Sequence, residues 1–226
     1  MKSETLIELP HHNHLSINRN ISHSWSNLVA LAREHGIEIK ATSAYRSFQD
    51  QKRIWNLKAS GQRTILDDHE KAIPFEKFNL NDPVSIQQLI FTILRWSALP
   101  GLSRHHWGTD LDIIDQQKLN QNPEYKVQLI PSEYAPGGIF EELGHFLDLH
   151  LESSDFFRPY RIDLGGVAPE PWHLSHKETA EAFIDQISID KFQKFLNEFG
   201  EDLLLKDSIQ ENLEEIFTRF VYNYSS

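Results

Sequence analysis

Helix-type and strand-type segments follow one another along this chain without regular alternation, and this order limits the possible folds more than any other feature. Apolar residues recur at helical spacing in several regions, whereas residues 37–42 alternate between apolar and polar side chains and three other short stretches are typical of strands. A doubly wound sheet needs strands and helices in strict alternation, so the chain is predicted to adopt an α+β fold. The predicted helices are 22–36, 47–60, 84–96 and 139–150, with two or three more across 177–222, and the predicted strands are 37–42, 111–114, 156–160 and 172–174.

The chain of 226 residues suits one domain of good size, and its character changes near both ends. Residues 1–20 form a polar lead-in without a periodic apolar pattern. Residues 21–176 make up the predicted main domain, which contains a polar, loop-like insertion at 61–83. Residues 177–226 are charged and periodic, and they are predicted to form a helical C-terminal extension that packs on the same domain.

The composition excludes several classes of protein. The chain has no cysteine, which excludes a disulfide framework, a thiolate zinc site, an iron–sulfur cluster and a cysteine nucleophile. Any metal site must therefore be built from His, Asp and Glu. Lys and Arg number 22 against 33 acidic residues, for a formal net charge of -11, which argues against binding to nucleic acid or to anionic membranes.

The sequence also bears on location. The first ten residues lack a basic segment followed by an apolar stretch, so no secretory signal is visible. The longest predominantly apolar stretch, Leu89–Leu94, is too short to span a bilayer. The expectation is a soluble cytoplasmic protein without a membrane span, or a periplasmic one if the chain is a mature fragment.

The segment Ser-Arg-His-His-Trp-Gly-Thr-Asp-Leu-Asp, which starts at residue 103, combines histidines and carboxylates. His105 and Asp112 are seven residues apart, and Gly108 allows the chain to turn between them. Asp112 lies between Leu111 and Ile113 on a predicted strand, so its side chain faces away from that apolar pair. A carboxylate held this way beside a loop histidine is a plausible half of a metal site.

The tetrapeptide Glu170–His173 can complete such a site. If Trp172 packs inward, His173 points the other way and supplies a third ligand. Two histidines and an aspartate with one open position form a catalytic zinc arrangement. Glu170 would then accept a proton from the activated water, which requires Pro171 to break the strand alternation between Glu170 and His173.

A third segment, Ser-Ala-Tyr-Arg-Ser from residue 43, ends a predicted strand and enters a helix. Arg46 at this position can face a developing oxyanion or a substrate carboxylate.

The three motifs SxHxxGxxxD, EPWH and YRS…Q resemble those of the zinc D-alanyl-D-alanine carboxypeptidases of the VanY type, in the same order along roughly residues 28–176. Their superfamily also contains lysostaphin-like peptidases and the hedgehog signalling domain. The resemblance implies a zinc metallopeptidase domain with a small antiparallel sheet, flanking helices and one Zn²⁺. It implies His105, Asp112 and His173 as zinc ligands, Glu170 as general base, Arg46 as the group that stabilises the tetrahedral intermediate, and Ser103, Tyr45 and Gln51 near the substrate.

By this resemblance, the expected activity is hydrolysis of a peptide bond in a peptidoglycan-derived peptide, with D-alanyl-D-alanine carboxypeptidase first. An L-alanyl-D-glutamate or cross-bridge endopeptidase is the alternative within enzymes. A non-catalytic zinc-bearing binding module is the alternative of another class. Two positions depart from the family pattern: Asp110 stands where a small residue is usual, and Ser175 where an arginine is frequent.

Other titratable groups are expected to lie outside the metal site. His106 can compete for the metal, but its spacing of six to Asp112 fits the family less well. Glu142 and His145 suggest half of a di-iron motif, yet the chain has no second Glu-x-x-His, so a solvated helix face is expected.

Two further patterns are also given structural interpretations. Ser188 and Lys191 match Ser-x-x-Lys by chance, because no Ser-Asp-Asn or Lys-Thr-Gly accompanies them. The three histidines near the start are expected to belong to the lead-in; they are His11, His12 and His14.

Overall fold

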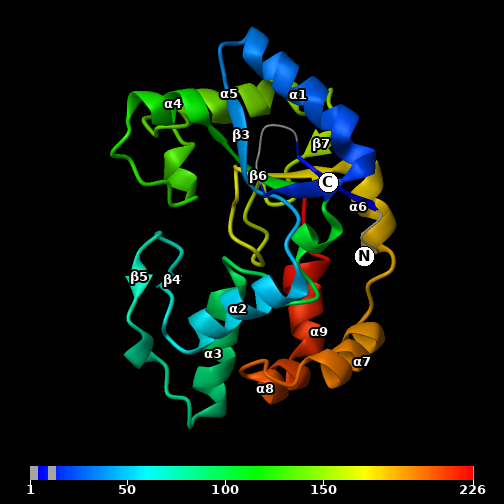
Figure 1. Ribbon diagram of the computed structural model, residues 1–226. Coiled ribbons are helices and arrows are strands. Elements are labelled where there is room, and N and C mark those ends of the chain that lie inside the picture. The colour runs from blue at the N-terminus through cyan, green and yellow to red at the C-terminus, as the bar shows by residue number, and fades with distance from the viewer. Residues whose placement is uncertain (1–4, 10–13, 226) are drawn as a thin grey trace.

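The computed structural model describes residues 5–9 and 14–225, and Figure 1 shows its elements. The strands are β1 (Leu6–Glu8), β2 (Ser16–Asn18), β3 (Ile39–Ser43), β4 (Ile65–Leu66), β5 (Ala72–Ile73), β6 (Asp110–Asp115), β7 (Phe156–Phe157) and β8 (His173–His176). The helices are α1 (Ser22–Glu34), α2 (Phe48–Ala59), α3 (Pro83–Leu94), α4 (Gln116–Gln121), α5 (Glu141–His150), α6 (Lys177–Ile184), α7 (Ile189–Phe199), α8 (Lys206–Glu211) and α9 (Leu213–Ile216), the last continuing into a π-helical turn, Phe217–Val221.

A four-stranded antiparallel sheet of order β3-β6-β8-β7 lies at the centre of the molecule. Every residue of β6 is buried, as expected for a strand with a neighbour on each side. Short strands and helices without strict alternation confirm the predicted α+β fold with a small antiparallel sheet.

One face of this sheet packs against α1 and α5. Leu111, Ile113 and Leu174 project from β6 and β8 into a hydrophobic core that also contains Trp25 of α1 and Phe146 of α5. Figure 1 shows α1 and α5 together on this side of the sheet. Because side chains alternate along a strand, the residues between these apolar ones face the opposite side, toward α2 and α3.

A second core joins α2 and α3 to the C-terminal helices. Trp55 of α2 and Leu89 of α3 share this cluster with Leu196, Ile216 and Phe217 of the C-terminal segment. The indole N–H of Trp55 donates a 3.0 Å hydrogen bond to the carbonyl of Leu204. The C-terminal helices therefore support the helix that follows the Arg46 segment (Figure 1).

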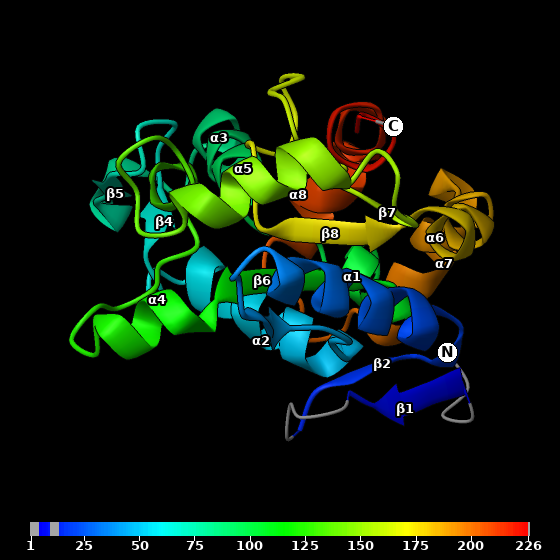
Figure 2. The same ribbon diagram turned by 90° about the horizontal axis from the view of Figure 1, so that it is seen from above.

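The lead-in is more structured than its polar composition predicts. Strands β1 and β2 form an antiparallel hairpin, which Figure 2 shows at one margin of the molecule. Leu9 and Ile17 are buried in the first core, and the Ile21 side chain beyond the hairpin joins them. Strands of three residues are too short to give a readable period, which is why the pattern was missed. His11 and His12 lie outside the described residues.

Other segments also differ from expectation in detail. The predicted loop at 61–83 contains the β4–β5 hairpin, anchored by the buried Ile65, and the turn-rich region after β6 contains α4. The C-terminal segment has four α-helices instead of two or three. Strand β7 is shorter than predicted and β8 begins one residue later, because these edges are set by pairing between distant segments.

Candidate metal centre and active site

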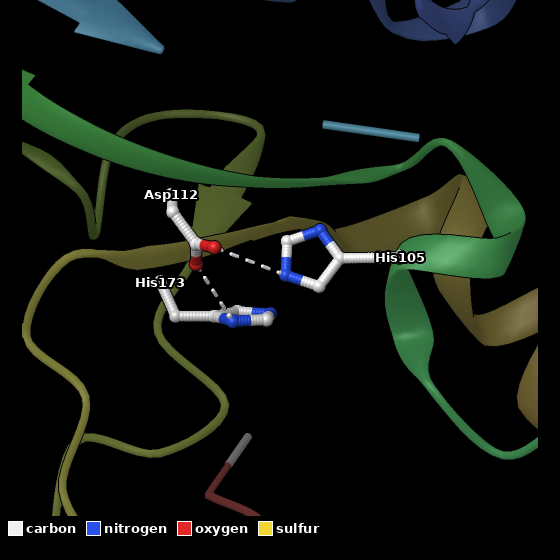
Figure 3. Close-up of side chains that lie close together, drawn as sticks. All are labelled: His105, Asp112 and His173. Atoms are coloured by element: carbon white, nitrogen blue, oxygen red, sulfur yellow. Dashed lines mark ion pairs between the residues drawn. The ribbon is translucent and has the colours of Figure 1, made fainter. Parts of the chain in front are cut away.

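His105, Asp112 and His173 meet on the sheet face turned away from α1 and α5. Asp112 of β6 and His173 of β8 are register partners in the antiparallel sheet, so their side chains lie side by side. His105 reaches them from the 3-10 turn Arg104–Trp107, which precedes β6. One potential ligand atom from each residue lies within 4.8 Å of the others, and all three residues are buried (Figure 3).

Gly108 connects the histidine turn to strand β6. Its φ is 68°, in the left-handed region that favours glycine. A Cβ atom at this position would lie 2.9 Å from the backbone nitrogen of Asn18 in β2. The hairpin therefore packs directly on the glycine that brings His105 back to Asp112.

Hydrogen bonds fix which nitrogen of each histidine faces the centre. The Nδ1–H of His105 donates to the carbonyl of Ala44 at 2.8 Å, which leaves Nε2 at 3.3 Å from Asp112 Oδ2. The Nε2–H of His173 donates to Asp110 Oδ1 at 2.9 Å, which leaves Nδ1 at 3.3 Å from Asp112 Oδ1. Burial lowers the pKa of His173, but hydrogen bonds to Asp110, Asp112 and Glu170 raise it well above its usual value, so the metal-free protein holds a proton at Nδ1. A metal ion would replace that proton and bind the inward nitrogens of both histidines through their lone pairs.

These lone pairs fit a divalent metal ion. Among the described residues, Asp112 Oδ1 is a buried oxygen without a hydrogen-bond partner. Burial alone would raise the pKa of Asp112, but the neighbouring histidines hold it well below its usual value. Two imidazole nitrogens and one carboxylate match the donor set of catalytic zinc sites, in which three protein ligands leave one position open.

Glu170 lies next to these three residues. His173 N–H donates to the Glu170 carbonyl at 3.1 Å, which closes a turn with Pro171 at its second position, where proline is favoured. This turn brings Glu170 Oε2 to 3.2 Å from His173 Nδ1, on the side of the sheet that the prediction required. Trp172 points into the first core, as expected.

Arg46 approaches the same centre from the end of β3. Its Nη1 donates to Gln51 Oε1 at 2.9 Å and its Nη2 donates to Ser43 Oγ at 2.8 Å. Nη2 also lies 3.8 Å from Asp112 Oδ2. The Arg46 guanidinium is thus held with one edge toward His105, Asp112 and His173, which we call the metal-type cluster.

A cleft of about 480 Å³ opens over these groups. Arg46, Ser103 and Glu170 line it together with the three potential ligands. Tyr45 and Gln51 do not line it: the Gln51 amide is fully buried and also donates to the Ala98 carbonyl at 2.7 Å. Of the three predicted substrate contacts, the structure brings only Ser103 to the cleft.

A buried charge network behind His173 was missed by the motif analysis. Asp110 is fully buried and accepts hydrogen bonds from Arg104 Nε at 2.9 Å and Thr109 Oγ1 at 2.6 Å, besides that from His173. Arg104 Nη2 also donates to Ser175 Oγ at 2.6 Å. Burial opposes the charged form of Asp110, yet Arg104 and His173 keep its pKa far below the usual value.

The two departures from the family pattern, Asp110 and Ser175, therefore meet at one guanidinium. The two departures themselves were the signal available in the sequence, whereas their facing positions on β6 and β8 follow from a sheet register that the sequence alone does not give. The partner Arg104 could not be read from that pairing, since it comes from the preceding turn.

The remaining candidates have structural roles. His106 Nδ1 donates to the Arg46 carbonyl at 2.6 Å and its Nε2 accepts from Gly101 N–H at 3.0 Å, so both nitrogens are occupied. Burial lowers its pKa to about 4. Ser188 Oγ accepts from Lys191 N–H and caps α7.

Glu142 and His145, which suggested half of a di-iron motif, lie on α5, away from His105, Asp112 and His173. Glu142 forms a 2.7 Å ion pair with Lys118 there, and His145 lines a separate hollow with it.

The small antiparallel sheet with this cluster on one face defines a fold of the D,D-peptidase type. The model of the VanY D-alanyl-D-alanine carboxypeptidase family matches residues 14–179, and the chain belongs to that family. An uncharacterised protein of Haemophilus influenzae is 37% identical over 126 residues, covering 55% of this chain and 93% of the relative. A second uncharacterised protein of the same organism is 33% identical over 98 residues, covering 42% of this chain and 63% of the relative.

Solved structures agree with this fold. A vancomycin-resistance D,D-pentapeptidase VanY in complex with Zn(II) superposes with a TM-score of 0.52 at 20% identity, covering 83% of this chain and 88% of that one. The LdcB LD-carboxypeptidase superposes with a TM-score of 0.53 at 18% identity, covering 86% of this chain and 79% of that one. Within the described residues, none of the helices is long and apolar enough to cross a membrane.

Proposed function

We propose that this protein is a zinc-dependent peptidase that hydrolyses a peptide bond in peptidoglycan-derived peptides. The observation that supports this most directly is the convergence of His105 Nε2, a free Asp112 oxygen and His173 Nδ1 beside Glu170. Two imidazole nitrogens and one carboxylate oxygen, all buried and within 4.8 Å of one another, form the donor set of a catalytic zinc site. Membership of a peptidase family supports the same assignment.

In the proposed mechanism, the chain's own residues bind the substrate and move the proton. Zinc held by His105, Asp112 and His173 would supply Lewis acidity to the scissile carbonyl and to water. Glu170 accepts the proton of the attacking water and later delivers it to the leaving amine. Arg46, held by Gln51, donates hydrogen bonds to the oxyanion that develops.

The preferred substrate is a peptide that ends in D-alanyl-D-alanine. The family description supports this choice, and a fold relative was solved with D-alanine-D-alanine at a TM-score of 0.50 and 20% identity. An L-alanyl-D-glutamate or cross-bridge endopeptidase would use the same groups. Mass spectrometry of the products from one defined muropeptide separates these activities, because only the carboxypeptidase releases free D-alanine.

Metal content and turnover together test the proposal. The wild-type protein should bind about one zinc, His173→Ala should lose it, and Glu170→Gln should keep the zinc while losing turnover by about 100-fold or more. A folded, zinc-supplemented wild-type protein without zinc would refute the metallopeptidase assignment. Zinc binding with no cleavage of any muropeptide would favour the binding-module alternative.

A further inference from the structure

The wall of the cleft formed by the end of α2 and the segment after it carries two cations that the proposed mechanism does not use. Lys58 lies near the end of α2 and Arg63 follows that helix, and both line the cleft. The other two cations there are already engaged: Arg104 by Asp110, and Arg46 by Gln51. In the part of the chain that the structure describes, Lys58 and Arg63 have neither an ion pair nor a side-chain hydrogen bond.

The Lys58 ammonium has no ion pair and no hydrogen bond among the described residues, and the charge of Glu170 favours its protonated form only from beyond ion-pair distance. Lys58 is only 8% exposed, although lysine is almost never buried unless paired. Burial, and then the charge of Arg63, lower its pKa to about 8, so most of the side chain remains protonated at neutral pH. A buried cation is costly to the folded state, and an anion that enters the cleft would offset that cost.

Hydrogen-bond donors are in excess in this cleft. The indole N–H of Trp96, another lining residue, is buried without an acceptor among the described residues. The carboxylates that line the cleft, Asp112 and Glu170, belong to the metal-type cluster and its base. A basic wall is notable in a chain with a net charge of -11, because composition alone favours acidic surfaces. The complementary ligand is a carboxylate, which only accepts hydrogen bonds.

We propose that Lys58 and Arg63 form a carboxylate-binding subsite that selects peptides with a free carboxylate near the scissile bond. The proposal rests on the proposed peptidase function and specifies its substrate class. Two carboxylates of such peptides have this chemistry: that of the C-terminal residue, and that of an internal D-isoglutamate.

Three peptides separate these sources. The first contains D-isoglutamate and ends in D-alanyl-D-alanine with a free carboxylate. The second is its C-terminal amide, and the third has D-isoglutamine in place of D-isoglutamate. Each is tested with wild type, Lys58→Met and Arg63→Gln. Lys52→Met is the matched control, since Lys52 lies on the same helix but faces Asp202 at 3.8 Å, outside the cleft.

We expect Lys58→Met to lower kcat/KM for the first peptide by about 10–100-fold, as for a lost hydrogen bond to a charged group, mainly through KM. Lys52→Met should match the wild type. If the effect of Lys58→Met disappears with the amide, the subsite binds the terminal carboxylate. If it disappears with the isoglutamine peptide, the subsite binds the internal one. Wild-type kinetics for both Lys58→Met and Arg63→Gln on the first peptide would overturn the proposal.

A binding measurement distinguishes failure of the subsite from failure of the function. Calorimetric titration of the same peptides into zinc-supplemented Glu170→Gln protein does not depend on turnover. Lys58-dependent binding of the acid peptide supports the subsite even if the wild type cleaves nothing, in which case only the peptidase function fails. The subsite proposal is refuted if Glu170→Gln and the double variant Glu170→Gln with Lys58→Met both bind the three peptides with equal affinity.

Discussion

Replacing Asp110 tests whether the buried network behind His173 controls the metal-binding form of that histidine. In Asp110→Ala, Arg104 and the His173 Nε2–H both lose a buried acceptor. Removing one partner of a buried ion pair costs about 3–5 kcal/mol of unfolding free energy. Typical domains have an unfolding free energy of only about 5–15 kcal/mol, so this variant should lose a large fraction of its stability and unfold at a clearly lower urea concentration.

The conservative variant Asp110→Asn separates stability from metal binding. The Asn oxygen can still accept from His173 or Arg104, but it lacks the charge that makes both bonds strong. We expect most of the stability to remain, while zinc affinity falls by about 10–100-fold, as for other partners of metal-binding histidines.

Three measurements check this prediction. Urea unfolding gives the stability of both variants, and competition with a chromophoric chelator gives the zinc affinity of Asp110→Asn. The ¹⁵N shifts of His173 in the zinc-bound protein report which nitrogen carries the proton. Wild-type zinc affinity in Asp110→Asn, with the His173 proton still on Nε2, would show that the carboxylate does not tune the ligand.

Three further predictions concern the parts of the fold that hold the cleft. Gly108→Ala forces a side chain at φ 68° against the Asn18 backbone and should cost about 1–3 kcal/mol in urea unfolding; an unchanged midpoint would contradict the packing described for the hairpin. Phe217→Ala should cost about 3–5 kcal/mol in the same assay, because this fully buried ring joins the C-terminal segment to the second core. Since the pKa of Lys58 is lowered from 10.5 to about 8, its charged form weakens the folded state below pH 8, and this penalty fades as the pH rises toward 10.5. The stability advantage of Lys58→Met over the wild type should therefore shrink by about 2–3 kcal/mol between pH 7 and pH 10, and a pH-independent difference would contradict the assigned shift.

Local patterns gave the direction of the central side chains correctly. The alternation of Leu111, Asp112 and Ile113 predicted which way the carboxylate faces, and Pro171 was identified as the residue that must turn the chain. Both features depend on neighbours in sequence, where backbone geometry dominates. The assignment of ligand and base roles remains a prediction.

Features that depend on distant pairing could not be read from the chain. Gln51 was expected at the substrate, but its side-chain oxygen accepts from Arg46 and its side-chain nitrogen donates to the Ala98 carbonyl. The second contact joins residues 47 positions apart in the sequence. The Arg104–Ser175 contact spans 71 residues, and no local period encodes it. The short β1–β2 hairpin packs against Gly108, which is distant in the sequence, and no local pattern encodes that contact.

The pairing of Asp112 with His173 across β6 and β8 also affects how long the folded protein resists degradation in the cell. A shift of one residue in that pairing would turn one of the two side chains into the apolar core, so only the correctly paired sheet presents both candidate ligands on one face. An ion that binds the folded chain alone stabilises it by about 2.7 kcal/mol at a free concentration 100 times its Kd. If this protein binds zinc as proposed, scarcity of zinc would shorten its survival against proteases, and its abundance would follow the metal supply even when no substrate is present.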